Sequence, residues 1–82
     1  MSKIPRDISG KDLCKLLSKY GYKIIRQTGS HIRLTSNKMG YEHSITIPDH
    51  NPVKIGTINK ILNDISNYLK IQKEVILSHL VN

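Results

Sequence analysis

The chain has no phenylalanine and no tryptophan, and four tyrosines are its only aromatic residues apart from histidine. Its core must therefore be aliphatic, and 13 isoleucines and 8 leucines supply the side chains for one compact core. Proteins that hold single-stranded nucleic acid usually stack bases on exposed aromatic rings. Because aromatic residues are so few, a stacking platform of that kind is not expected.

Cysteine and clustered glycine are also missing. A single cysteine, Cys14, excludes an internal disulfide and is typical of a reducing compartment such as the cytoplasm. The five glycines are scattered, so no phosphate-cradling loop is expected, and Cys14 and the histidines lack the short paired spacings of a metal site. We therefore expect neither a metal nor another cofactor.

Long apolar runs are absent as well. No segment approaches the roughly 20 apolar residues that a membrane span requires, and residues 1–7 lack the apolar centre of a signal peptide. The sequence therefore predicts a soluble cytoplasmic protein that does not associate with membranes. Its 82 residues predict a single domain, residues 1–82.

Acidic residues are few, and they are unevenly placed. Six Asp and Glu face 13 Lys and Arg, which gives a formal charge of +7 and a pI of about 9.8. Residues 1–40 hold all of this excess, with nine basic and two acidic residues, whereas residues 41–82 are neutral. A basic half favours a polyanionic ligand, although a merely solvated face remains an alternative.

The pattern of apolar residues predicts an α+β fold. Ser9 and Asp12 resemble a capping box, and leucines at helical spacing predict a helix over residues 10–20. Three strands are expected over residues 22–27, 31–35 and 41–47, followed by a helix from residue 55 and a short third helix within residues 67–82. The expected order is α-β-β-β-α, with a three-stranded antiparallel sheet, helices on one face and the other face open.

The first two strands should meet in a hairpin. Gly29 and Ser30 fit a two-residue turn in which Gly29 supplies a positive φ. Alternation then points Ile32 and Leu34 to the core, and His31 and Arg33 to the open face.

This pairing of an imidazole with a guanidinium suits cleavage of RNA. The 2′-hydroxyl of RNA is a built-in nucleophile, so a general base, a general acid and positive charge near the phosphate suffice. Histidine can take or give a proton near neutral pH, whereas DNA lacks the hydroxyl and would stay intact. A strand histidine with no catalytic role is the alternative. His43 is expected to be half-buried at the sheet edge and His79 to be inert.

Several motifs together resemble the HicA (YcfA-like) toxin family of prokaryotic toxin–antitoxin pairs. The resemblance covers about residues 9–66, and residues 67–82 form a less well matched extension. It is carried by five segments: Ser9-Gly10-Lys11-Asp12-Leu13, Gly21-Tyr22, Arg26-Gln27-Thr28-Gly29-Ser30-His31, Ile47-Pro48-Asp49-His50 and Gly56-Thr57-Ile58-Asn59-Lys60-Ile61-Leu62.

The resemblance implies a fold like the double-stranded-RNA-binding domain and an mRNA-cleaving endoribonuclease inhibited by a HicB-type antitoxin in a hetero-oligomer. The family's catalytic histidine falls on His31, and His50 is a possible secondary catalytic residue. The turn Gly29–Ser30 would position the site. Ile32 stands where the family often has a polar residue after the histidine. Because Ile32 points to the core, this difference puts the assignment of His31 in little doubt. The side chains assigned to phosphate binding are Lys23, Arg26, Arg33 and Lys54.

Two other functions use the same basic half. A non-catalytic module that binds double-stranded RNA needs the charge but no histidine, and a pure interaction partner would only bind an acidic protein. If the chain is a toxin, an acidic partner that covers His31 and the first helix would inactivate it by occlusion.

Overall fold

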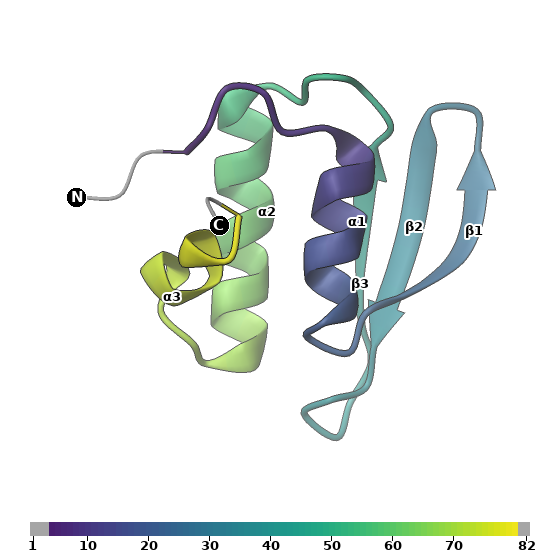
Figure 1. Ribbon diagram of the computed structural model, residues 1–82. Coiled ribbons are helices and arrows are strands. Elements are labelled where there is room, and N and C mark those ends of the chain that lie inside the picture. Colours follow the sequence, from purple (N-terminus) through teal and green to yellow (C-terminus); the bar gives the residue numbers. More distant parts are fainter. Residues whose placement is uncertain (1–3, 81–82) are drawn as a thin grey trace.

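The computed structural model describes residues 4–80 and has the expected α+β architecture (Figure 1). Two helices cover one face of a three-stranded antiparallel sheet of order β1-β2-β3, and a third, short helix packs beside the second. The order α-β-β-β-α and the likeness to the double-stranded-RNA-binding domain are thus confirmed. The elements are α1 (Gly10–Ser18), β1 (Lys23–Thr28), β2 (His31–Ser36), β3 (His43–Pro48), α2 (Ile55–Leu69) and α3 (Lys73–Ser78).

The capping box at the start of α1 is confirmed. The Ser9 hydroxyl accepts from the Asp12 amide at 3.0 Å, and the Asp12 carboxylate accepts from the Ser9 amide at the same distance. Both bonds satisfy amides that a helix leaves without partners at its first turn. The helix ends earlier than residue 20, and Gly21 follows it with a φ of +86°.

The hairpin turn also has the expected form. Thr28 pairs with His31, which leaves Gly29 and Ser30 as the two turn residues, and Gly29 has a φ of +57°. A positive φ at the first turn position matches the right-handed twist of the two strands. The turn therefore sets the register that faces His31 away from the helices.

A β-bulge at Ile25 changes the register further along the hairpin. Ile24 pairs with Leu34, and Arg26 pairs with Arg33, so Ile25 is the extra residue on β1. Unbroken alternation would put residues 23 and 26 on opposite faces. The bulge brings Lys23 and Arg26 to the same open face.

The core lies between the sheet and the helices. Ile32 and Leu34 are buried as expected, and they pair with Ile47 and Ile45 of β3, which are also buried. The third strand begins later than the expected residue 41, because Tyr41 precedes β3 and is 59% exposed.

Helix α2 begins at residue 55, as expected, and is 15 residues long. It continues to Leu69 because Ile65, Tyr68 and Leu69 are all buried against the core. At its other end, Ile55 lies outside the apolar stripe and is partly exposed. Burial of one face, rather than local propensity, sets the length of this helix.

The expected third helix is present within the C-terminal extension. Ile76 and Leu77 of α3 are buried in the same core, whereas Val75 faces outward. The extension is therefore part of the domain's packing up to residue 80, and its last two residues lie outside the described range. Within residues 4–80, no helix has the length and apolar character needed to cross a membrane.

Candidate active site

His31 lies at the first position of β2, directly after the hairpin turn. Its cross-strand neighbours are Thr28 on β1 and Pro48 on β3. The side chain is exposed on the sheet face that carries no helix. The structure therefore leaves this imidazole open to a large ligand.

Two arginines stand next to it on the same face. Arg33, two residues from His31 and hence roughly 7 Å along β2, pairs directly with Arg26 across the hairpin. Like charges placed opposite each other in a sheet lower stability. No acidic residue pairs with either arginine in the strand register, since the β3 neighbour of Arg33 is Thr46. An uncompensated pair of this kind favours an anion on the open face.

The segment after β3 is hydrogen-bonded to the hairpin turn. The Asp49 amide donates to the Ser30 carbonyl at 2.6 Å. The Gln27 side-chain amide donates to the Asp49 carboxylate at 3.2 Å and to the Gly29 carbonyl at 3.1 Å. These bonds bring the segment that carries His50, which is itself exposed, to the same end of the sheet as His31.

The start of α1 supports this segment from the other side. The Gly10 amide donates to the His50 carbonyl at 2.9 Å. A Cβ placed on Gly10 would overlap the Pro48 carbonyl oxygen and lie 3.0 Å from the Asp49 Cα. Glycine is therefore required here by the close approach of helix and strand.

Three supporting residues were missed as site residues by sequence reasoning: Gln27, Asp49 and Gly10. Gln27 and Asp49 lie within the quoted motifs, but their pairing links positions 22 residues apart, and no local pattern indicates it. Gly10 was assigned only to a helix start. Its position as the first residue of a helix, directly after the capping residue Ser9, was the one available signal.

The two remaining predicted phosphate ligands, Lys23 and Lys54, lie outside the arginine pair. Lys23 pairs with Thr35, four residues and roughly 13 Å along β2 from the histidine. Lys54 precedes α2 and is exposed at the end of the molecule where the hairpin turn also lies (Figure 1). The structure thus groups Arg26 and Arg33 with His31 and sets Lys23 apart from them.

The other two histidines, His43 and His79, contact tyrosine side chains. His43 is half-buried as expected, with Nδ1 at 2.6 Å from the Tyr22 hydroxyl and its ring stacked on Tyr68 at 4.7 Å. Burial raises the pKa of the Tyr22 hydroxyl well above its usual value, so this group stays protonated. His79 is exposed and contacts Tyr20 edge-to-face at 6.0 Å.

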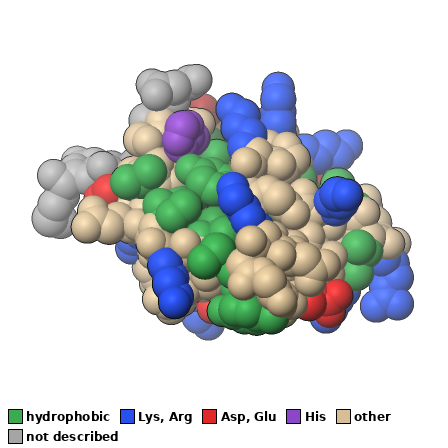
Figure 2. Space-filling model, turned by 90° about the horizontal axis from the view of Figure 1, so that it is seen from below, with side chains coloured by type: hydrophobic (Ala, Val, Ile, Leu, Met, Phe, Trp, Pro, Cys, Tyr) green, Lys and Arg blue, Asp and Glu red, His purple; other side chains and the backbone are tan. Residues whose placement is uncertain are grey.

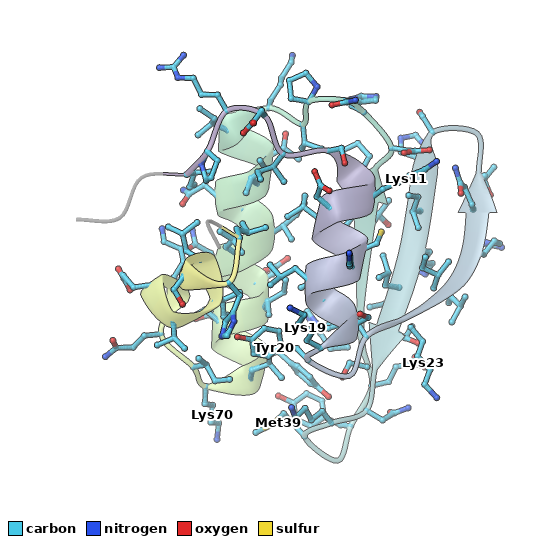
Figure 3. The ribbon with its side chains drawn as sticks, in the orientation of Figure 1. Lys11, Lys19, Tyr20, Lys23, Met39 and Lys70 are labelled. Carbon is cyan, nitrogen blue, oxygen red and sulfur yellow. The ribbon has the colours of Figure 1, made fainter. Side chains whose placement is uncertain are left out.

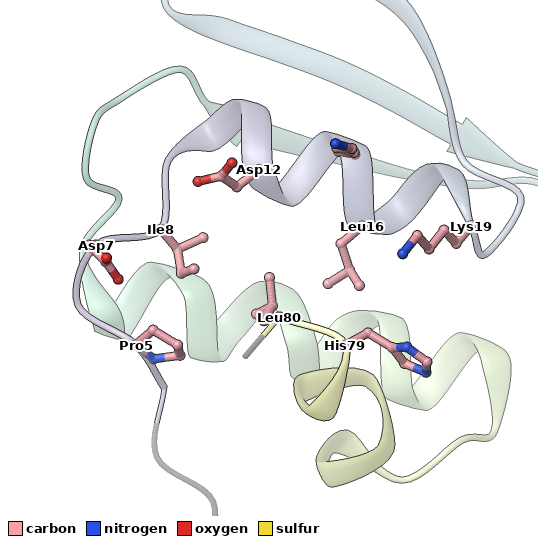
Figure 4. Close-up of a pocket in the computed structure, with 9 residues that line it drawn as sticks. Pro5, Asp7, Ile8, Asp12, Leu16, Lys19, His79 and Leu80 are labelled. Atoms are coloured by element: carbon pink, nitrogen blue, oxygen red, sulfur yellow. The ribbon is translucent and has the colours of Figure 1, made fainter. Parts of the chain in front are cut away.

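A hollow of about 570 Å³ lies on the side of α1 that faces away from the sheet (Figure 4). It is lined by residues of α1, by the segment before it and by the end of the chain, including Asp12, Lys19 and His79. Charges of both signs line it, and none of the predicted site residues does. Across residues 4–80, no three His, Cys, Asp or Glu side chains gather as potential metal ligands.

Basic side chains surround an apolar centre at one end of the molecule (Figure 2). The molecule viewed from the end that carries the β2–β3 turn shows hydrophobic side chains gathered at the centre, with Lys and Arg side chains around them (Figure 2). The formal charge of +7 therefore acts as a general attraction for anions, to which the two arginines add a local one.

Comparison with known proteins gives one result. A model of the family described as the HicA toxin of bacterial toxin–antitoxin systems matches residues 10–66, which is more than half of the chain. No curated protein and no solved structure matches the chain. The matched range runs from the first residue of α1 into the last turn of α2 and so includes the whole sheet. The chain therefore belongs to the HicA family of toxins from bacterial toxin–antitoxin systems.

Proposed function

We propose that this toxin is an endoribonuclease that cleaves mRNA in the cytoplasm and uses His31 for general acid–base catalysis. The 2′-hydroxyl attacks the adjacent phosphorus, the 5′-oxygen of the next nucleotide leaves, and a 2′,3′-cyclic phosphate forms. One group takes the proton of the hydroxyl and another gives a proton to the leaving oxygen. No step requires a metal ion or another cofactor.

The observation that carries this proposal is the position of His31 beside Arg33 and Arg26 on an open sheet face. An exposed imidazole can reach a sugar hydroxyl, and the arginines can stabilise the charge that builds up on the phosphate. Lys23 lies further along the hairpin and Lys54 lies outside the sheet, and both would hold neighbouring phosphates of the RNA. The turn Gly29–Ser30 fixes the direction of the imidazole.

A single histidine does not easily serve as both acid and base in one step. His50 is the candidate for the second role, because its segment is hydrogen-bonded to the turn that carries His31. Replacement of His50 by alanine should then remove one limb of the pH–rate profile while cleavage continues at a reduced rate. An unchanged pH–rate profile would mean that a lysine or water, and not His50, transfers the second proton.

Cleavage of an unstructured RNA by the purified chain in EDTA tests the main proposal. The wild type should cleave the RNA and leave the matching DNA intact, and His31→Ala should lose at least roughly 100-fold in rate. His79→Ala is the matched control, since it removes an exposed histidine far from the hairpin and should keep full activity. Circular dichroism must show that both variants are folded. Equal cleavage by folded His31→Ala would overturn the assignment.

The fold also supports a second candidate, a non-catalytic module that binds double-stranded RNA. This function needs the basic surface but not the imidazole. Retardation of duplex RNA by the wild type and by His31→Ala alike, without cleavage of any RNA, would favour it.

The family implies an antitoxin, and we propose that it is of the HicB type and binds the toxin in a hetero-oligomer. Inducible expression of the chain should arrest growth, and co-expression of the antitoxin encoded with it should restore growth. His31→Ala should be harmless at the same protein level. Growth arrest by that variant would show that toxicity does not depend on His31.

A further inference from the structure

An apolar groove lies between α1 and the hairpin, on the side of the sheet opposite His31. Its volume is about 590 Å³. Ile24, Ile32 and Leu34 of the hairpin and Cys14 of α1 contribute to its lining. Cys14 is buried, and burial raises the pKa of its thiol, so this side chain adds to the apolar part of the lining.

The outer wall of this groove is the edge strand β1. All six residues of β1 are exposed, and within residues 4–80 its outer edge pairs with no strand. Ile24 is 58% exposed and Ile25 is 55% exposed. Large apolar side chains on a free strand edge favour pairing with another chain. Exposed backbone groups and an adjoining apolar groove are the two features that an added strand needs.

The charge around the groove indicates which kind of protein segment would bind there. Lys11 and Lys15 of α1 line it together with the apolar residues, and Lys23, the first residue of β1, borders it at one end. None of the described residues that line it is acidic. Lys11 and Lys23 lie toward opposite ends of the space between α1 and the hairpin (Figure 3). An occupant with acidic residues next to apolar ones fits this arrangement.

We propose that β1 and this groove form the docking site for an extended segment of a partner protein, which adds to the sheet as a fourth strand. The segment alternates apolar residues, which enter the groove, with acidic residues. The groove spans residues 11–18 of α1, roughly 10 Å, which is room for two inward side chains of a strand about 7 Å apart.

Two other occupants fit less well. A second copy of this chain would bring the same lysines against each other, and each copy carries a formal charge of +7. RNA would match the lysines, but its phosphates gain nothing from an apolar lining. An acidic and apolar protein segment satisfies both features.

Docking at this edge would also affect the candidate active site. Arg26 and Arg33, which pair across the hairpin, lie on the open side of the sheet. Acidic residues on the outward side of an added strand would lie next to them and compete with phosphate. This consequence rests on the proposed function and makes the partner an inhibitor, which fits the antitoxin of the pair.

The test measures the affinity of the purified chain for the antitoxin encoded with it. Ile24→Asp places a charge in the groove and should weaken binding roughly tenfold or more. Val75→Asp is the matched control, because Val75 is also exposed, at 48%, but lies on α3. Hydrogen exchange in the wild-type complex should slow at the backbone amides of β1.

A second pair of variants avoids any change to the strand. Lys11→Glu reverses a charge that lines the groove, whereas Lys19→Glu reverses a charge directly after the same helix that does not line it. The first should weaken binding several-fold and the second should not. Unchanged affinity in both Ile24→Asp and Lys11→Glu, or unchanged exchange at β1, would overturn the proposal. The proposal would also be overturned if the chain formed a homodimer that Ile24→Asp abolishes, or if Ile24→Asp weakened the binding of RNA.

Cleavage of RNA by the same variants without antitoxin separates this proposal from the proposed function. Ile24→Asp and Lys11→Glu should cleave RNA at the wild-type rate, because both residues face away from His31. Binding that is lost while cleavage persists supports the docking site. Absence of cleavage in the wild type would refute the nuclease and leave the binding measurement valid.

Discussion

Gly10 shows how a residue without a side chain can control the position of a candidate catalytic group. It holds α1 so close to β3 that a methyl group would overlap the Pro48 carbonyl oxygen. Pro48 is the cross-strand neighbour of His31, and the residue after it bonds to the hairpin turn. Displacement of residue 48 would therefore reach the imidazole through the backbone.

Replacement of Gly10 by alanine should destabilise the fold by about 1–3 kcal/mol, as overpacking does, and should lower the cleavage rate beyond the loss of folded protein. Gly56→Ala is the matched control, because a Cβ at Gly56, in the first turn of α2, would meet nothing within 4 Å. That variant should be neutral or more stable by up to about 1 kcal/mol. Chemical denaturation and the RNA assay measure both effects. Equal stability of the two variants would contradict the steric argument.

Gly29 is required for a different reason. Its φ of +57° lies in the left-handed region, and nothing lies within 4 Å of a Cβ built there. Gly29→Val should cost roughly 1–2 kcal/mol, whereas Gly29→Asn should cost less because asparagine tolerates this conformation. Thermal unfolding compares the two variants. If valine were tolerated as well as asparagine, backbone conformation would not be the reason for glycine at this turn.

At the scale of elements, α1 depends on its first turn. The backbone and side-chain hydrogen bonds of Ser9 lower the pKa of the Asp12 carboxyl below its ordinary value. Because the folded pKa is the lower one, the unfolded chain binds the proton more readily. The carboxylate therefore contributes stability above pH 4 that is lost as the pH falls through its folded pKa.

Asp12→Asn should consequently reduce the loss of stability between about pH 5 and pH 2, relative to the wild type. Ser9→Ala should lower stability at pH 7 by about 1 kcal/mol, because it removes the cap of the Asp12 amide. Urea unfolding as a function of pH measures both variants. Glu42→Gln, which removes an exposed carboxylate near the β2–β3 turn, is the control. An equal effect of Asp12→Asn and Glu42→Gln would refute a special role for the capping box.

The hairpin is the element on which the site is built, and its bulge decides where charge lies. The extra residue Ile25 brings Lys23 and Arg26 to the face that carries His31 and Arg33. The same bulge leaves Ile24 directed at the groove on the other face. One irregularity thus separates a cationic face, which we propose binds RNA, from an apolar edge, which we propose binds a partner.

For the whole molecule, the charge of +7 and the open sheet face predict strongly salt-dependent RNA binding. If the four candidate phosphate ligands all contact RNA, log K should fall with log salt with a slope of about −3 for single strands. Binding of a 2′-O-methyl RNA, which resists cleavage, measures this slope. Arg33→Gln should reduce it by about 0.7, whereas Lys60→Gln, an exposed lysine on α2, should leave the slope nearly unchanged. Equal changes in both variants would mean that RNA binds to the charge of the molecule and not to the hairpin.

Local signals in the sequence determined most of the fold and the direction of His31. The capping box, the positive-φ glycine of the turn and the alternation of Ile32 and Leu34 act within a few residues, so each can be recognised in the chain itself. Only the tertiary structure decided the bulge at Ile25, the bond between Gln27 and Asp49 and the close packing of Gly10 on Pro48. These depend on how segments distant in the sequence fit together, because strand register and steric contact are fixed only when the sheet and helices pack.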